Sequence, residues 1–151
     1  MQITRENPDQ PELIALIAEL DAYQDALYPP ESRHALDLAS LKQDHVLFFV
    51  ARDDAQQALG CCAVVLGESF GEVKRMFVRP ASRGQGVARR LLLALEAAAA
   101  QAGCRQLMLE SGPDQPEALS LYAALGYQRR GPFGSYRDDP LSVFMHKPLA
   151  A

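Results

Sequence analysis

The spacing of apolar residues changes several times along the chain, and each change marks an expected helix or strand. Residues 1–5 are strand-like, and residues 45–52 form a nearly continuous apolar run rich in β-branched and aromatic side chains. Between them, apolar residues recur at helical spacing from position 13 to 27, and more weakly from 36 to 41. The two prolines at positions 29 and 30 must end the first helix, and Ser32 is placed to cap the second.

The middle of the chain predicts an antiparallel meander followed by a long helix. Strands are expected over residues 59–66 and 72–78, each separated from the preceding strand by a polar or glycine-containing turn. The helix is expected over residues 87–102, where Gly103 ends it. Its predicted buried face consists of Val87, Leu91, Leu95, Ala98 and Ala102.

The last third of the chain adds a strand over residues 105–111, a helix over 117–125, and closing strands over 127–133 and 142–147. The complete order is therefore β-α-α-β-β-β-α-β-α-β-β. No repeat, linker or composition shift divides the chain, so we expect one mixed α/β domain over residues 1–151.

The junction between the strand at 72–78 and the following helix has the features of an anion site. It contains Arg83-Gly84-Gln85-Gly86, and glycines allow backbone N–H groups to approach a ligand closely. The first turn of a helix also leaves its N–H groups unpaired and carries partial positive charge. Arginines at 79, 83, 89 and 90 add charge around this turn, so a pyrophosphate would fit there.

Three interpretations of this loop can be compared by their glycine spacing. A dinucleotide-binding fingerprint would need a third glycine where Arg89 stands, and a Walker loop would need a Gly-Lys-Ser/Thr ending that the sequence lacks. A surface turn that needs glycines only for its backbone geometry remains open on this pattern alone.

Composition narrows the class of partner. The 151 residues are 48% hydrophobic and 23% charged with a net charge of −4, which excludes a disordered chain and disfavours nucleic acid or an anionic membrane as partner. No apolar run approaches the roughly 18 residues of a membrane span, and no secretory signal is visible, so we expect a cytoplasmic location. Cys61, Cys62 and Cys104 are expected to be reduced thiols, and no histidine spacing indicates a metal site.

Residues 83–88 resemble the acyl-CoA signature of the GNAT (Gcn5-related) N-acetyltransferases, Gln/Arg-x-x-Gly-x-Gly/Ala. Residues 72–78 look like that family's central strand, and Leu121-Tyr122-x-x-Leu125-Gly126-Tyr127 looks like its later helix–turn–strand. From Glu31 onward the chain is also similar to the YsnE-like acetyltransferase subgroup, in residues 29–36, 71–74 and 132–145. The resemblance implies a GNAT-like fold, with a mixed, mostly antiparallel sheet of six to seven strands flanked by about four helices.

The same resemblance implies a cofactor, acetyl-CoA, and the residues that bind it. Its pyrophosphate would lie on the backbone amides of residues 84–89, and its pantetheine would pair with residues 76–78 on a sheet that opens after Val78. The Val78 N–H could polarise the thioester carbonyl. Gln115 stands where many relatives have a cofactor-binding asparagine. The expected contacts are Met76, Phe77, Val78, Arg83, Gly84, Gln85, Gly86, Val87, Ala88, Arg89 and Gln115.

Two catalytic residues are expected from the same alignment of motifs. Through its motif, Tyr122 resembles the family's general acid, and a phenol is a suitable proton donor to a departing thiolate. Without the motif, Tyr122 would be interpreted as a core tyrosine on an amphipathic helix. Glu72 is the first choice as general base, eleven residues before Arg83, on a face that strand alternation would give it together with Lys74, Met76 and Val78. Glu110 is the second choice and His34 the third; the simpler interpretation of Glu72 is a solvated charge.

The acceptor is expected to be the amine of a small molecule. Its pocket should lie between residues 28–34, the ends of two central strands, and the loop at 133–142. The candidate residues of this pocket are Glu31, His34, Arg75, Glu110 and Tyr136. Because they include both carboxylates and cations, they suit an amino-acid-like zwitterion.

No cysteine occupies a motif position, so direct transfer in a ternary complex is expected. The competing function is a non-catalytic acyl-CoA-binding sensor or regulatory module, which would need the glycine loop but neither acid nor base. Many relatives dimerise through C-terminal strands, and residues 141–145 are apolar enough to join another sheet edge.

Overall fold

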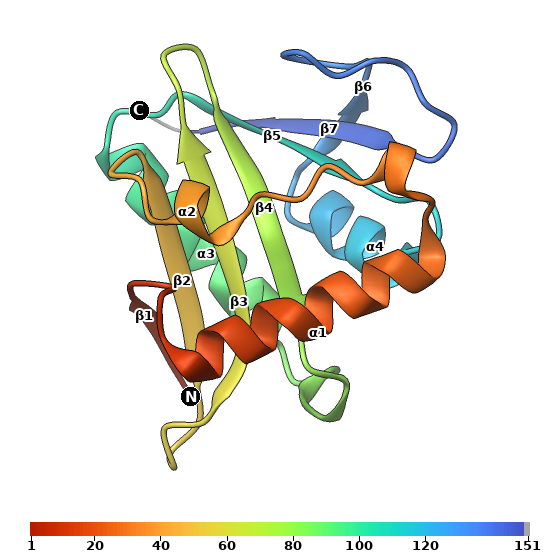
Figure 1. The fold of residues 1–151 in the computed structure, drawn as a ribbon. Coiled ribbons are helices and arrows are strands. Elements are labelled where there is room, and N and C mark those ends of the chain that lie inside the picture. Colours follow the sequence, from red (N-terminus) through yellow and green to blue (C-terminus); the bar gives the residue numbers. More distant parts are fainter. Residues whose placement is uncertain (150–151) are drawn as a thin grey trace.

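The computed structural model describes residues 1–149 as a central sheet covered by helices on both faces (Figure 1). Its elements within these residues are β1 (Gln2–Arg5), α1 (Pro11–Leu27), α2 (Leu38–Leu41), β2 (Val46–Arg52), β3 (Ala58–Leu66), β4 (Gly71–Val78), α3 (Val87–Gln101), β5 (Gln106–Ser111), α4 (Pro116–Ala124), β6 (Gln128–Arg130) and β7 (Val143–Pro148), with short 3-10 turns at η1 (Pro30–Ser32) and η2 (Pro80–Ser82). The predicted order of helices and strands is confirmed.

Seven strands in the described residues form one sheet in the order β1-β2-β3-β4-β5-β7-β6. The β4–β5 pair is parallel and the other neighbours are antiparallel, so the predicted mixed, mostly antiparallel sheet is confirmed. Because β7 pairs with both β5 and β6, residues 143–145 of the apolar stretch 141–145 lie within this sheet.

The continuous apolar run in β2 reflects a strand that is covered on both sides. Val46, Phe48 and Val50 pack with residues of α1, whereas Leu47 and Phe49 pack with residues of α3. Figure 1 shows α1 and α2 over one face of the sheet and α3 behind the other. Three layers therefore enclose two apolar cores.

The buried face of α3 differs from the predicted one at four apolar positions. Leu92 and Ala99 are fully buried, whereas Ala98 is only partly buried and Ala102 is exposed. The helix packs across β2, β3 and β4 together, so its buried stripe is wider than a single row of residues. Ala102 lies beyond the last helical residue, as the C-terminal cap.

The sheet opens between β4 and β5 earlier than the sequence indicated. Parallel pairing covers only residues 71–73 of β4 with 107–109 of β5, so the two strands separate after Val73 and not after Val78. An irregularity in β4 accompanies the separation: Arg75 has φ of 58°, and the β3–β4 register shifts between Cys61 and Ala63. This β-bulge leaves residues 74–78 without a partner strand on the β5 side.

For the residues of β4 that follow the bulge, the side chains lie on the opposite face of the sheet from the one that simple alternation predicts. Lys74 and Arg75, although consecutive, both contact the α1–α2 connection, while Val78 joins Val73 in the core under α3. The expectation that Glu72 shares a face with Met76 and Val78 is therefore wrong, because simple alternation fails across the extra residue.

Two local expectations are corrected as well. Ser32 is not a helix cap: it lies in η1 and donates to Asp139 Oδ2 at 2.8 Å, while Asp37 caps α2 by accepting from the Ser40 N–H at 2.8 Å. The strand expected over 127–133 covers only Gln128–Arg130 in the structure, as β6 at the edge of the sheet. Phe133 lies beyond this strand, because its side chain packs with Met108 and Phe144.

The cysteines are free, as expected: Cys61 and Cys62 are buried and Cys104 is partly buried. Burial raises the pKa of the Cys61 thiol to about 12, so it stays protonated and unreactive. Within residues 1–149, no helix is both long and apolar enough to cross a bilayer. The same residues bring together no histidine, cysteine and carboxylate cluster suited to a metal ion.

Candidate active site

A cavity of about 380 Å³ lies where β4 and β5 have separated. It is bounded by residues 76–78 of β4, the glycine loop, the start of α3 and one face of α4. The lining includes ten of the predicted cofactor contacts: Met76, Phe77, Val78, Arg83, Gly84, Gly86, Val87, Ala88, Arg89 and Gln115. Gln85 belongs to the same loop but is exposed outside this lining.

The glycine loop leaves the N-terminus of α3 accessible to an anion. Gly84 and Gly86 both have φ of +78°, and a Cβ at either position would meet no described atom within 4 Å. Gly86 is the N-cap of the 15-residue α3, and no described side chain accepts a hydrogen bond at this end of the helix. The first backbone N–H groups of α3 therefore have no capping side chain within residues 1–149. Open backbone, unpaired donors and the helix dipole together fit the pyrophosphate of a coenzyme A thioester.

The arginines around the loop have different tasks. Arg79 pairs with Glu19 at 3.0 Å and donates to the Ala58 carbonyl, so it ties β4 to α1 and β3. The Nε of Arg83 donates to the Val78 carbonyl at 2.9 Å, and its guanidinium lies 5.2 Å from the Tyr23 ring centroid. Both Arg83 and Arg89 line the cavity; Arg83 also supports the loop through its contact with Val78.

Tyr122 lies where this cavity meets a second, smaller one. It lines both, as do Met76 and Gln115, and it is only 5% exposed. Burial raises the pKa of its phenol, and nearby Glu110 raises it further. Tyr122 is therefore protonated at neutral pH and able to donate.

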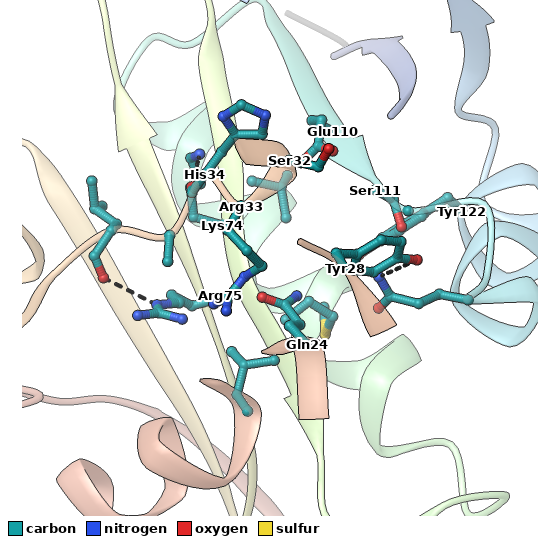
Figure 2. Close-up of a pocket in the computed structure, with 17 residues that line it drawn as sticks. Gln24, Tyr28, Ser32, Arg33, His34, Lys74, Arg75, Glu110, Ser111 and Tyr122 are labelled. Carbon is teal, nitrogen blue, oxygen red and sulfur yellow. Dashed lines mark hydrogen bonds between the residues drawn. The ribbon is translucent and has the colours of Figure 1, made fainter. Parts of the chain in front are cut away.

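The second cavity, of about 70 Å³, lies between α1, the α1–α2 connection and the separated ends of β4 and β5 (Figure 2). Glu110 and Ser111 reach it from β5, and Tyr28 reaches it from the end of α1. Glu110 is mostly buried, and burial raises its pKa, although Ser142, His34 and Lys74 oppose this shift. A carboxyl with a raised pKa is a better proton acceptor near neutral pH than an exposed one.

Glu72 occupies a different environment from Glu110. Its Oε2 accepts a hydrogen bond from the Tyr136 hydroxyl at 2.6 Å and lies 3.1 Å from Lys74 Nζ. Lys74 also donates to the His34 carbonyl at 2.8 Å and to the Tyr136 hydroxyl at 2.6 Å. Glu72 lies outside the lining of both cavities, and this cluster instead joins β4 to the α1–α2 connection and to the loop before β7.

The predicted acceptor residues divide in the structure. His34, Arg75 and Glu110 line the smaller cavity, whereas Glu31 and Tyr136 do not. Arg75 is already committed: it donates to Asp21 Oδ1 at 2.6 Å and to the Leu36 carbonyl at 3.1 Å.

The segment predicted to border the acceptor pocket, residues 28–34, does line this cavity, through Tyr28 and Arg33 as well as His34. Sequence reasoning missed other residues of this wall, among them Gln24, Lys74 and Ser111. Gln24 belongs to a helix whose pattern indicates only core packing, and Lys74 shares the wall with Arg75 because of the bulge. The polar residues near the end of the first predicted helix, next to two prolines, were a signal that could have pointed to Gln24.

Comparisons with known proteins agree with this geometry. The acetyltransferase (GNAT) family model matches residues 13–127. IAA acetyltransferase from Azospirillum brasilense is 47% identical over 149 residues, 97% of each chain. The uncharacterized N-acetyltransferase YsnE from Bacillus subtilis is 34% identical over 141 residues, 91% of this chain and 93% of that protein.

A solved structure from Klebsiella pneumoniae, assigned to the acyl-CoA N-acyltransferases, matches with a TM-score of 0.84 and 44% identity over 99% of this chain and 97% of its own. These matches confirm the resemblance that the motifs indicated, including similarity to YsnE. The glycine loop fits the acetyl-CoA that GNAT enzymes use. The chain belongs to the GNAT family and is an acetyl-CoA-dependent N-acetyltransferase.

Proposed function

We propose that the enzyme transfers the acetyl group directly to the amine of a small, amino-acid-like acceptor held in the smaller cavity. The observation that carries this proposal is the junction at Tyr122, where the cofactor groove and the Glu110 cavity share a wall. A donor and an acceptor bound on either side of this wall would meet without a covalent enzyme intermediate. Bound acetyl-CoA supplies the activated thioester.

The protein groups that would hold acetyl-CoA are backbone groups for the most part. The N-terminus of α3 and the glycine loop bind its pyrophosphate, and the unpaired edge of residues 76–78 binds its pantetheine as an added strand would. The Val78 N–H polarises the carbonyl that reacts. Gln115 adds a side-chain contact at the junction of the two cavities.

Two side chains would move the protons. Glu110 accepts a proton from the acceptor amine as nitrogen bonds to the acetyl carbon, and Tyr122 donates one to sulfur as the carbon–sulfur bond breaks. Support comes from position, because Tyr122 lines both cavities and Glu110 lines the smaller one, and from burial, which raises the pKa of Glu110 and makes it more basic than an exposed glutamate. Glu110 replaces Glu72 as the proposed base because Glu110 lines the cavity.

An amino-acid-like acceptor agrees with the charges around the cavity. Glu110 can receive the amine, while Arg33 and His34 line the wall formed by the α1–α2 connection. Arg33 pairs with Asp21 and Asp25, and the Asp25 side chain is 67% exposed. An acceptor carboxylate would compete with Asp25, the more exposed of the two carboxylates that pair with Arg33.

Matched acceptor pairs test this assignment. Each small α-amino acid is compared with the amine that remains when its carboxylate is removed, and acetylated products are detected by mass spectrometry. We expect the amino acid to have at least about tenfold higher kcat/KM, and Arg33→Met to reduce this preference. Equal or better activity with the decarboxylated amines would rule out a carboxylate-bearing acceptor.

We also propose that the enzyme acts in the cytoplasm, in line with its expected use of the acetyl-CoA made there. A homodimer built on the C-terminal strands would use β6, because β6 is the exposed edge and β7 is paired on both sides.

A further inference from the structure

Tyr28 joins the end of α1 to the loop that precedes α4. It is the C-terminal cap residue of α1 and is 7% exposed. Its hydroxyl accepts hydrogen bonds from the Asp114 backbone N–H at 3.2 Å and from Gln115 Nε2 at 3.4 Å, across 86 and 87 residues of sequence. Figure 2 shows the phenol of Tyr28 beside Ser111 and Tyr122.

Gly112 leaves the space that the Tyr28 phenol occupies. A Cβ built on Gly112 would lie 1.7 Å from the Tyr28 hydroxyl oxygen and 2.0 Å from Cζ, so any side chain at 112 would displace the ring. Gly112 directly follows β5, and its carbonyl accepts from the Gln115 N–H at 3.3 Å. The loop and the phenol are therefore fitted to each other by close backbone approach.

Gln115 is a long side chain that needs such a partner. It lines both cavities, and Tyr28 is the hydrogen-bond partner of its side chain within residues 1–149. Because the amide nitrogen is held by the phenol, the amide oxygen remains available to a ligand in the groove. Removing the phenol hydroxyl would free the whole side chain and add an ordering cost when the ligand binds.

We propose that Tyr28 is a positioning residue that fixes the Gln115 side chain and so contributes to acetyl-CoA binding. This inference rests on the proposed contact between Gln115 and acetyl-CoA. Tyr28 acts through Gln115, and the chemical step belongs to Tyr122 and Glu110. The consequence is a change in acetyl-CoA affinity with little change in kcat.

A double-mutant cycle tests the connection on the full-length enzyme. Tyr28→Phe, Gln115→Ala and the double variant are compared for acetyl-CoA dissociation constant, KM and kcat. We expect Tyr28→Phe to raise the dissociation constant about 3- to 10-fold, with kcat within about twofold. We expect the same Tyr28→Phe change to have no further effect in the Gln115→Ala background, because the group it positions is absent.

Gly112→Ala supplies an independent variant, because it displaces the phenol without removing it. We expect it to weaken acetyl-CoA binding as Tyr28→Phe does, with melting temperatures used to confirm that each variant is folded. Unchanged affinity in Tyr28→Phe, or additive effects in the double variant, would overturn the inference. Unchanged affinity in Gln115→Ala would overturn the Gln115 contact itself, while the transfer reaction would still be tested separately by Tyr122→Phe.

Discussion

Burial raises the pKa of the two side chains proposed to move protons. Tyr122 is 5% exposed, so its phenol is held in the neutral form that can donate. Glu110 lines the neighbouring cavity and is also largely buried, so its carboxylate is destabilised relative to an exposed glutamate. Burial therefore makes Glu110 a better proton acceptor; for Tyr122 it keeps the phenol neutral, and the suitability of Tyr122 as the acid rests on its position at the junction of the two cavities.

Tyr122→Phe should lower kcat about 100-fold, the size expected when a general acid is removed. Acetyl-CoA affinity should change little, because the ring remains in place and only the hydroxyl is lost. Kinetics with a responsive amine and calorimetric titration of acetyl-CoA measure the two effects separately. Retained kcat would show that the thiolate leaves without a proton from Tyr122.

Glu110→Gln should lower kcat/KM by about 100-fold and at the same time stabilise the fold at neutral pH. The folded pKa of Glu110 lies above its unfolded value, so its contribution to stability is greatest at low pH and falls as pH rises through the folded pKa. The wild-type kcat/KM should accordingly rise with pH through that same pKa, which lies above the usual glutamate range. Thermal melting at pH 7 and a pH–rate profile provide the measurements.

Glu72→Gln is the matched comparison for the base, since it changes the other candidate glutamate in the same way. It weakens the interaction with Lys74 and Tyr136, so we expect a lower melting temperature and a much smaller kinetic loss than for Glu110→Gln. A loss of about 100-fold in Glu72→Gln, with Glu110→Gln active, would reverse the assignment.

The glycine loop is the element on which the proposed binding of acetyl-CoA depends. At φ of +78°, Gly86→Ala places a Cβ in left-handed backbone, which costs about 1–2 kcal/mol of folding stability. Since no described atom lies within 4 Å of that Cβ, the free protein accommodates it sterically, and acetyl-CoA binding should show the larger effect. Melting curves of wild type and Gly86→Ala, with and without acetyl-CoA, would separate the loss of folding stability from the loss of binding. An equal rise in melting temperature on adding acetyl-CoA to both proteins would argue against this binding site.

The pairing of β1 with β2 predicts a pH-dependent stability. Hydrogen bonds from Arg52 hold the pKa of Glu6 at about 2, well below its ordinary value. A depressed carboxyl pKa gives stability that is present above the unfolded pKa and is lost as pH falls toward 2. Wild type should therefore melt higher than Glu6→Gln at pH 7, and the difference should shrink below pH 4; a constant difference would contradict this pairing.

At the scale of elements, the sequence was informative where one residue type decides the outcome. The prolines before α1 and α4 and the glycine loop before α3 placed those helices to within a few residues. The bulge at Arg75 had no such marker, because a bulge is stabilised by its partner strand and surroundings. That missed bulge is why the sheet opening and the face of Glu72 were predicted wrongly.

At the scale of the whole molecule, the two halves of the site differ in how they are encoded. The cofactor half lies largely in one strand–loop–helix, residues 76–89, so its residues were predictable from a contiguous motif. The acceptor half combines the end of α1, the α1–α2 connection, β4 and β5, which only the tertiary structure brings together. Gln24 and Ser111 were missed for this reason.

The most direct test of direct transfer at the Tyr122 junction is acetyl-CoA-dependent thiol release measured across a panel of small amines. We predict that wild type releases coenzyme A only when a responsive amine is present, forming one acetylated amine per thiol. Tyr122→Phe and Glu110→Gln should each lose this activity about 100-fold while still binding acetyl-CoA. Undiminished amine-dependent turnover in both variants would contradict the account.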